Sequence, residues 1–280
     1  EFMLYSTPVQ TKDFTFDLNI NLSRNVSKVK ELADGVDYLF FNGDANFPIN
    51  VGTRVGHRLG EIYAKNLYKR DENGNMIVNK QGRPTKVSGE DAFQYTLDHP
   101  IGNIEPDLLM SVSPSFTYKG FTLSALFDMK FGGDIVSVSE AMATSTGLAA
   151  RTANRGNAEN GWKIVAPGVT ADGTVNSTAM NAQRYYTSMS GMAEEFVYDA
   201  SFIKLKELSL GYSFPKSILK KTPLTSLNVA FVARNLAYLM KHTPGTSPEG
   251  GYDTSMFSQA IDYMSVPYTR TFGLSINLGF

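Results

Sequence analysis

The sequence predicts an all-β fold in which antiparallel strands form a segment of a transmembrane β-barrel. Three observations favour it. Apolar and polar residues alternate along several stretches, the linkers between them are short and long in turn, and the last ten residues, TFGLSINLGF, alternate and end on an aromatic residue. Side chains at every second position share a strand face, and outer-membrane barrels join an apolar lipid face to short turns at one end and long loops at the other.

The alternation places the strands in order along the chain. Residues 1–6 read as a strand that enters a turn at 7–12, and 13–25 is the next strand. Strands 108–118 and 121–131 flank Lys119-Gly120, which reads as a tight hairpin turn. Strands 200–213, 226–234 and 269–280 follow. Each apolar face contains about five or six residues at alternate positions. This matches a strand of roughly 9 to 11 residues, the length that a tilted strand needs to cross a bilayer.

One strand, 200–213, contains a break in its alternation. Ile203 and Leu205 are in one phase, whereas Leu208 and Leu210 are in the other. A β-bulge near Lys206-Glu207 accounts for the change, because it inserts one extra residue into a strand.

Residues 26–107 are expected to supply an even number of further strands, because strand 13–25 and strand 108–118 run in opposite directions. The candidates are 61–68 and 76–79, on either side of a hairpin turn at Asn73-Gly74. This gives about nine strands in all. Nine strands with an open first edge do not close as a bacterial barrel, which favours even strand numbers.

Composition and motifs indicate no enzyme, cofactor or metal site. The formal charge of −1 gives no reason to expect a nucleic-acid partner, and the absence of cysteine excludes thiolate chemistry and Cys-ligated zinc. The three histidines lie at no ligand spacing from one another, and the adjacent Glu194 and Glu195 make a weak acid and base pair. RDENGN at 70–75 starts like a calcium loop but has Met76 where the turn needs glycine.

Several stretches together resemble the carboxy-terminal part of SusC/RagA-type TonB-linked (TonB-dependent) outer-membrane proteins of Bacteroidetes. They are TKDFTFDLNINLSRNVSKVKELADG, IGNIEPDLLMSVSPSFTYKGFTLSALFDMKFGGDI, DASFIKLKELSLGYSFPKSILKK, LNVAFVARNLAYL, SPEGG and VPYTRTFGLSINLGF. The resemblance implies that residues 1–280 are the last part of a large barrel in the outer membrane, in contact with its lipid. It also implies that 132–199 and 236–268 are long extracellular loops.

The resemblance further implies an importer of glycans (oligosaccharides), or sometimes of peptides. A SusD-like surface lipoprotein would cap the barrel, and the TonB-ExbB-ExbD complex would supply energy through an amino-terminal plug domain. The sequence contains no plug and no TonB box, so both would have to lie elsewhere. The resemblance supplies no catalytic residues and no individual ligand contacts.

Any ligand contacts are expected among polar and aromatic residues of the two long segments, as in Trp162, Tyr185, Tyr252 and Asp253. Aromatic rings there could stack on sugars or pack on a partner, or they could anchor the loops or form the interfacial girdle. Two alternatives to the importer stay open. One is a self-contained small outer-membrane barrel that acts as an adhesin or binding module, and the other is a soluble carbohydrate-binding β-sandwich.

Overall fold

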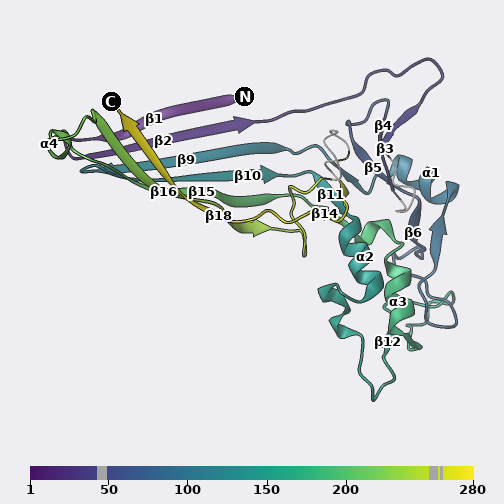
Figure 1. Ribbon diagram of the computed structural model, residues 1–280. Helices are drawn as coiled ribbons and strands as arrows, with labels where there is room; N and C mark the ends of the chain where they lie inside the picture. The colour runs from purple at the N-terminus through teal and green to yellow at the C-terminus, as the bar shows by residue number, and fades with distance from the viewer. Residues whose placement is uncertain (43–48, 252–257, 259–260) are drawn as a thin grey trace.

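The computed structural model describes residues 1–42, 49–251, 258 and 261–280. It consists of a long sheet, called the wall sheet below, and a lobe of small sheets and helices at one end of it (Figure 1). The short helix α4 (Lys216–Leu219) lies at the other end of the wall sheet, far from the lobe.

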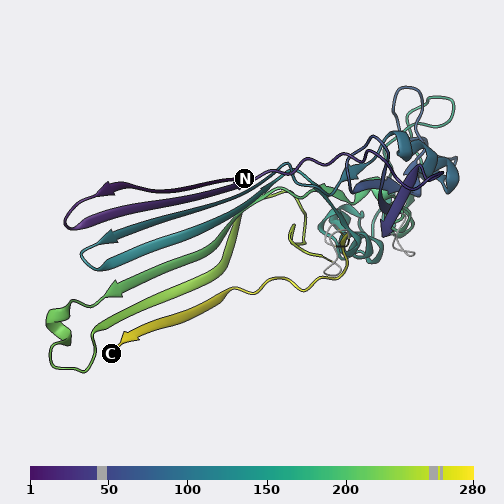
Figure 2. The same ribbon diagram turned by 90° about the horizontal axis from the view of Figure 1, so that it is seen from above.

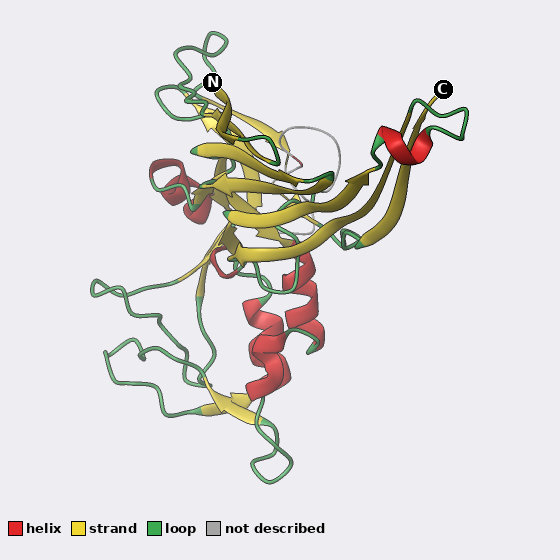
Figure 3. Ribbon diagram, turned by 90° about the vertical axis from the view of Figure 1, so that its left-hand side faces the viewer, coloured by secondary structure: helices red, strands yellow, loops and turns green. Residues whose placement is uncertain are grey.

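The wall sheet has seven strands, each antiparallel to its neighbours, in the order β1-β2-β9-β10-β15-β16-β18. β1 and β18 form its two free edges, so the sheet is curved but not closed (Figures 2 and 3). The strands are Phe2–Gln10, Phe14–Ser23, Leu108–Tyr118, Phe121–Phe131, Phe202–Ser213, Ser226–Lys241 and Thr271–Gly279. The antiparallel all-β wall predicted from the sequence is therefore confirmed.

The register places apolar and polar residues on opposite faces of the wall sheet. Paired positions give one apolar row across every strand: Val9, Phe16, Phe116, Leu123, Leu210, Phe231 and Leu274. The neighbouring row is small or polar: Gln10, Thr15, Thr117, Thr122, Gly211, Ala230 and Ser275. The apolar face stays open to its surroundings, since Leu210 is 53% and Leu274 73% exposed. A β-sandwich would bury such a face against a second sheet.

Two local predictions for these strands are confirmed. Lys119 and Gly120 both adopt positive φ, 46° and 90°, as a type I′ hairpin turn requires. At the predicted bulge, Leu126 pairs with Glu207 and Phe127 pairs with Leu205, so Lys206 has no opposite residue on β10.

One strand is longer than predicted: β16 continues to Lys241 rather than ending at 234. Its register against β15 shifts after Arg234, and Asn235 has a φ of 55°. This irregularity changes the phase of the alternation, which is why the pattern appeared to stop there.

The prediction of two additional wall strands at 61–68 and 76–79 is wrong, because β2 pairs directly with β9. β5 (Glu61–Ala64) joins β3 (Tyr38–Asn42), β4 (Ile49–Arg54) and β8 (Gly102–Asn103), whereas β6 (Asn66–Tyr68) pairs with β7 (Lys86–Ser88). Residues 76–79 make only isolated bridges. All four residues of β5 are buried, as in a globular core and unlike a strand with one face in lipid. Gly74 nonetheless adopts the positive φ of the expected turn.

The lobe contains most of the buried side chains. Its helical segments are α1 (Glu90–Asp98), α2 (Val138–Thr146), η1 (Ala150–Asn154), α3 (Ala182–Met189) and η2 (Ala193–Glu195). Its remaining strands are β11 (Asp134–Ser137), β12 (Lys163–Val165), β13 (Ala179–Asn181), β14 (Val197–Asp199) and β17 (Ile261–Asp262). The core forms around Ile62, Val136, Phe196 and Ile261.

The helices of the lobe begin at polar caps. The side chain of Ser137 accepts a hydrogen bond from Glu140 N at the start of α2, and that of Asn181 accepts one from Arg184 N at the start of α3. The segment 132–199 therefore contains regular helices and strands, and its buried residues share one core with residues 49–67 and Ile261. No helix within the described ranges is both long and apolar enough to span a membrane.

Candidate functional site

The polar face of the wall sheet becomes charged toward the lobe, around the bulge in β15. Lys206 Nζ lies 2.6 Å from Asp128 Oδ2 on β10, and Arg234 Nε on β16 lies 2.7 Å from Glu207 Oε2. The bulge gives β15 two charged residues in succession, and these pair with the strands on either side. These groups present both signs of charge on the face opposite the apolar rows.

A buried cation ties the segment 236–268 to this face. Lys204 is only 3% exposed, and its Nζ lies 2.6 Å from Glu249 Oε2. The same ammonium group lies 4.7 Å from the ring centre of Tyr268 and 5.2 Å from that of Tyr238. Tyr238 also donates a hydrogen bond to Glu249. A buried charge needs such partners, because removal from water is otherwise costly.

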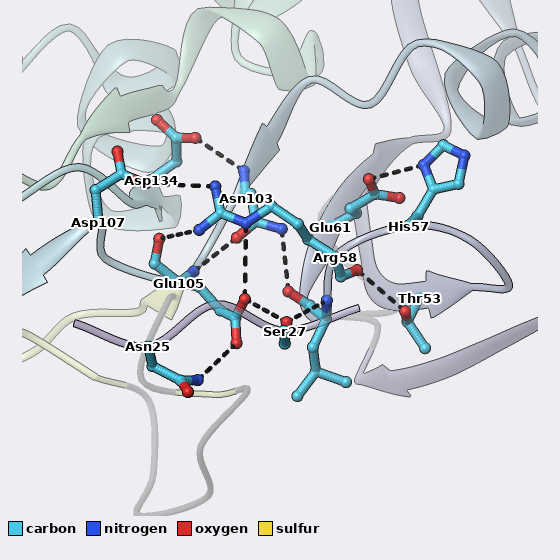
Figure 4. Close-up of polar contacts among 11 residues, drawn as sticks. Asn25, Ser27, Thr53, His57, Arg58, Glu61, Asn103, Glu105, Asp107 and Asp134 are labelled. Carbon is cyan, nitrogen blue, oxygen red and sulfur yellow. Dashed lines mark hydrogen bonds and ion pairs between the residues drawn. The ribbon is translucent and has the colours of Figure 1, made fainter. Parts of the chain in front are cut away.

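A second polar network joins the lobe to the wall sheet at the end of β2 and the start of β9 (Figure 4). Glu105 accepts hydrogen bonds from Ser27 Oγ at 2.5 Å and Asn25 Nδ2 at 3.4 Å, and Arg58 Nε lies 3.7 Å from Glu105 Oε2. Arg58 also approaches Asp107, with Nη1 to Oδ1 at 3.5 Å. Glu105 therefore links the segment 25–27, Arg58 and the start of β9. Its side chain is only 12% exposed, so these contacts are largely shielded from water.

The wall sheet continues into the lobe where β10 passes to β11. Gly132 and Gly133 turn the chain with φ of 73° and 75°. Asp134 then accepts a hydrogen bond from the backbone N–H of Asn103 at 2.8 Å, which ties β11 to β8. Burial of the Asp134 carboxyl raises its pKa, and nearby Asp199 raises it further, although the bond from Asn103 acts in the opposite direction.

Between these networks lies a pocket of about 480 Å³, called the junction pocket below. Its lining includes Asn25, Glu105, Lys130, Asp134, Phe202 and Glu249. It combines carboxylates, an amide and an ammonium group with apolar walls, so it can hydrogen-bond a polar ligand. No group of three His, Cys, Asp or Glu within the described part of the chain could hold a metal ion.

Of the residues predicted as ligand contacts, the two that the structure describes, Trp162 and Tyr185, do not line this pocket. Trp162 lies in the lobe and is 49% exposed, whereas Tyr185 is 8% exposed and packs in the lobe core beside Tyr186 with ring centres 5.2 Å apart. Burial raises the pKa of Tyr185 to about 12, as expected of a packed phenol. Tyr252 and Asp253 lie outside the described residues.

Sequence reasoning did not single out Arg58, Glu105, Lys204 or Asp134. Their partners are distant in sequence: 78 residues separate Ser27 from Glu105, and 45 separate Lys204 from Glu249. The only available signal was the position of Lys204 and Asp128 in the polar phase of their strands.

The chain is similar in sequence to TonB-dependent receptors. No protein-family model matches the chain. It is 28% identical over 298 residues to TonB-dependent receptor P3 of Formosa agariphila and 26% identical over 295 residues to TonB-dependent receptor SusC of Bacteroides thetaiotaomicron. Each match covers 100% of this chain, but only 28% and 26% of the respective relative. The chain thus spans less than a third of the length of these relatives.

The fold is similar to that of part of a solved peptide importer, RagAB. The RagAB peptide importer in the open-open state matches with a TM-score of 0.64 at 20% identity over 99% of this chain and 28% of that one. The structure of the RagAB peptide transporter gives a TM-score of 0.65 at 18% identity, again over 99% of this chain and 28% of that one. The resemblance seen in the sequence and the predicted barrel segment are confirmed.

Proposed function

Because this chain resembles SusC/RagA-type TonB-dependent receptors along its whole length, we propose that it forms part of the wall and outer loops of an outer-membrane importer. The observation that carries this proposal is the wall sheet itself. One face presents continuous apolar rows that no described segment covers, and the opposite face is polar and charged. In a barrel the first face contacts lipid and the second lines the lumen.

A row of aromatic residues lies at the end of the wall sheet where the strands are joined by short turns, and it supports a periplasmic position for this end. Phe14, Tyr118, Phe121 and Tyr212 form a row of aromatic residues there, with the rings of Phe121 and Tyr212 4.5 Å apart. Outer-membrane barrels carry such aromatic girdles at their interfaces with water. The lobe, which includes segment 132–199 and strand β17, then lies on the extracellular side.

We assign the junction pocket and the charged polar face to the ligand path, and glycans to the ligand, with peptides as the second candidate. The neighbouring solved structures are of a peptide importer, so the ligand class has to be decided by experiment. A SusD-like lipoprotein would cap the lobe side. The TonB-ExbB-ExbD complex would act through a plug domain in a part of the importer that this chain does not include.

The first test is to isolate outer membranes and detect this polypeptide, denatured, with an antibody against its last strand. We expect a band far above 30.8 kDa and a co-purifying lipoprotein. A band at 30.8 kDa with no partner would instead support a self-contained small barrel or binding module. Release from membranes by a salt or alkaline wash without detergent would support the soluble β-sandwich.

The ligand class is tested by uptake in cells. Fluorescently labelled oligosaccharides and peptides are supplied to cells with and without the gene, and with TonB inactivated. TonB-dependent uptake of oligosaccharide is the expected result. Uptake of peptides alone would contradict the glycan assignment but leave the importer in place.

A further inference from the structure

A second pocket of about 480 Å³, here called the lobe pocket, lies away from the junction pocket. It is formed where the end of α2, the segment after η1 and the start of α3 meet. Its lining includes Thr144, Arg155, Trp162, Asn181, Gln183 and Tyr186. A volume of this size is typical of small-ligand sites, and the importer proposal assigns it no role.

Trp162 provides an aromatic surface in this pocket at a cost in backbone energy. It is the only tryptophan of the sequence, it is 49% exposed, and its φ is 56°. Positive φ is unfavourable for a bulky side chain by roughly 1–3 kcal/mol, and such strain concentrates at ligand sites. The strained conformation is fixed by Trp162 N–H donating to Asn157 O at 2.8 Å and by Trp162 O accepting from Ala182 N at 2.9 Å.

Thr144 contributes a hydroxyl group without a partner. Its side chain is 0% exposed, and its Oγ1 makes no hydrogen bond. The next two residues of α2 behave differently, because Ser145 Oγ and Thr146 Oγ1 both donate to Met142 O, at 2.8 and 2.9 Å. A buried hydroxyl without a partner costs about 1–3 kcal/mol. A ligand hydroxyl that reached it would remove this penalty.

The electrostatics of the lobe pocket favour an anionic ligand. Among the residues that the structure describes, Arg155 is the only charged one in its lining, and none of them contributes a carboxylate there. The lining also includes the first residues of the eight-residue helix α3, whose first turn contains no acidic side chain. The amino end of a helix attracts negative charge through its dipole, and this attraction remains at α3 although Ala182 N and Arg184 N already donate to Trp162 O and Asn181 Oδ1.

We propose that the lobe pocket binds one sugar unit of an acidic saccharide. The sugar ring stacks on Trp162, a sugar hydroxyl bonds to Thr144, and the carboxylate lies toward Arg155 and the start of α3. The site deepens the importer proposal by naming acidic saccharides as the ligand class. It can be tested separately, because binding is measured without transport.

The experiment uses the full-length protein in detergent and saturation-transfer NMR. The probes are the methyl glycosides of glucuronate and galacturonate, each compared with its neutral parent, methyl glucoside or methyl galactoside. We expect at least one acidic glycoside to bind about tenfold more tightly than its parent, as for a charge-assisted hydrogen bond. Trp162→Ala should abolish the signal from that probe, and Arg155→Gln should reduce its affinity to that of the parent.

Thr144→Val separates a ligand contact from a structural role. The substitution keeps the shape of the side chain but removes the hydroxyl, so the unfolding temperature should stay the same or rise while affinity falls several-fold. Tyr95→Ala is the matched control, because Tyr95 is a 57% exposed aromatic residue of α1 outside this pocket. The proposal is overturned if Trp162→Ala binds like wild type, if no acidic glycoside exceeds its parent, or if Tyr95→Ala loses the signal equally.

Discussion

Leu274 and Ser275 are neighbours on β18 that point to opposite faces, and they offer a direct test of which face contacts lipid. Leu274 pairs with Phe231 near the middle of the strand and is 73% exposed. Ser275 pairs with Ala230 on the polar face. Arginine on the lipid side near the bilayer midplane costs about 2–4 kcal/mol, whereas lumen positions tolerate charge.

We therefore expect Leu274→Arg to lower the free energy of unfolding by about 3 kcal/mol, which is roughly a hundredfold in the unfolding equilibrium. Ser275→Arg should change it by less than about 1 kcal/mol, because an arginine there reaches water. Urea titrations of the full-length protein in phospholipid vesicles, followed by the gel mobility of the folded barrel, measure both values. Equal losses for the two variants, or a larger loss for Ser275→Arg, would refute the assignment of the faces.

Three further predictions concern the junction between wall sheet and lobe. Arg58→Met leaves Glu105 without its ionic partner, so urea unfolding of the lobe should show a loss of about 1–3 kcal/mol, and Arg58→Lys should lose less. Burial raises the folded pKa of Asp134 above its unfolded value, so its ionisation costs stability as the pH rises through the folded pKa. Asp134→Asn should hence be more stable than wild type at pH 7 but not at pH 3 in thermal melts, and equal differences at both pH values would contradict this. Gly132→Ala would place a Cβ atom 2.3 Å from Asp107 Oδ2 at a φ of 73°, so melts should show a loss of at least about 1 kcal/mol that Asp107→Ala partly restores.

Alternation was sufficient to find the wall strands because each face of the wall sheet is in a single environment, which selects either apolar or polar side chains along its whole length. Phe272 to Phe280 repeats with a period of two, as a strand between two different media must. The candidate strand 61–68 does contain strands, β5 and β6, but it was assigned to the wrong sheet: all four residues of β5 are buried, so β5 belongs to the lobe and not to a wall with one face in lipid. The lobe core was missed for a related reason, since small residues such as Ala141 and Ala193 read as loop composition until α2 and α3 bring them together.

The candidate sites were less predictable than the wall. An exposed tryptophan in a polar segment could be noticed from sequence, and Trp162 does line a pocket. Tyr185 is also an aromatic residue in a polar segment, yet it lies in the core. Its direction depends on the helical phase of α3, which decides which side chains of this helix point inward. The pairings of Arg58 and Lys204 depend on contacts between distant segments, which no spacing along the chain encodes.

The extra residue in β15 also affects how this strand tolerates changes in length. Removing any ordinary strand residue inverts the faces of everything on one side of it, because side chains alternate with a period of two. Lys206 is an exception, since Leu205 and Glu207 already occupy adjacent positions against Phe127 and Leu126. Its deletion would restore regular pairing with β10 and leave each remaining side chain on its present face. Natural relatives that lack the bulge should accordingly align with a single-residue gap at this position.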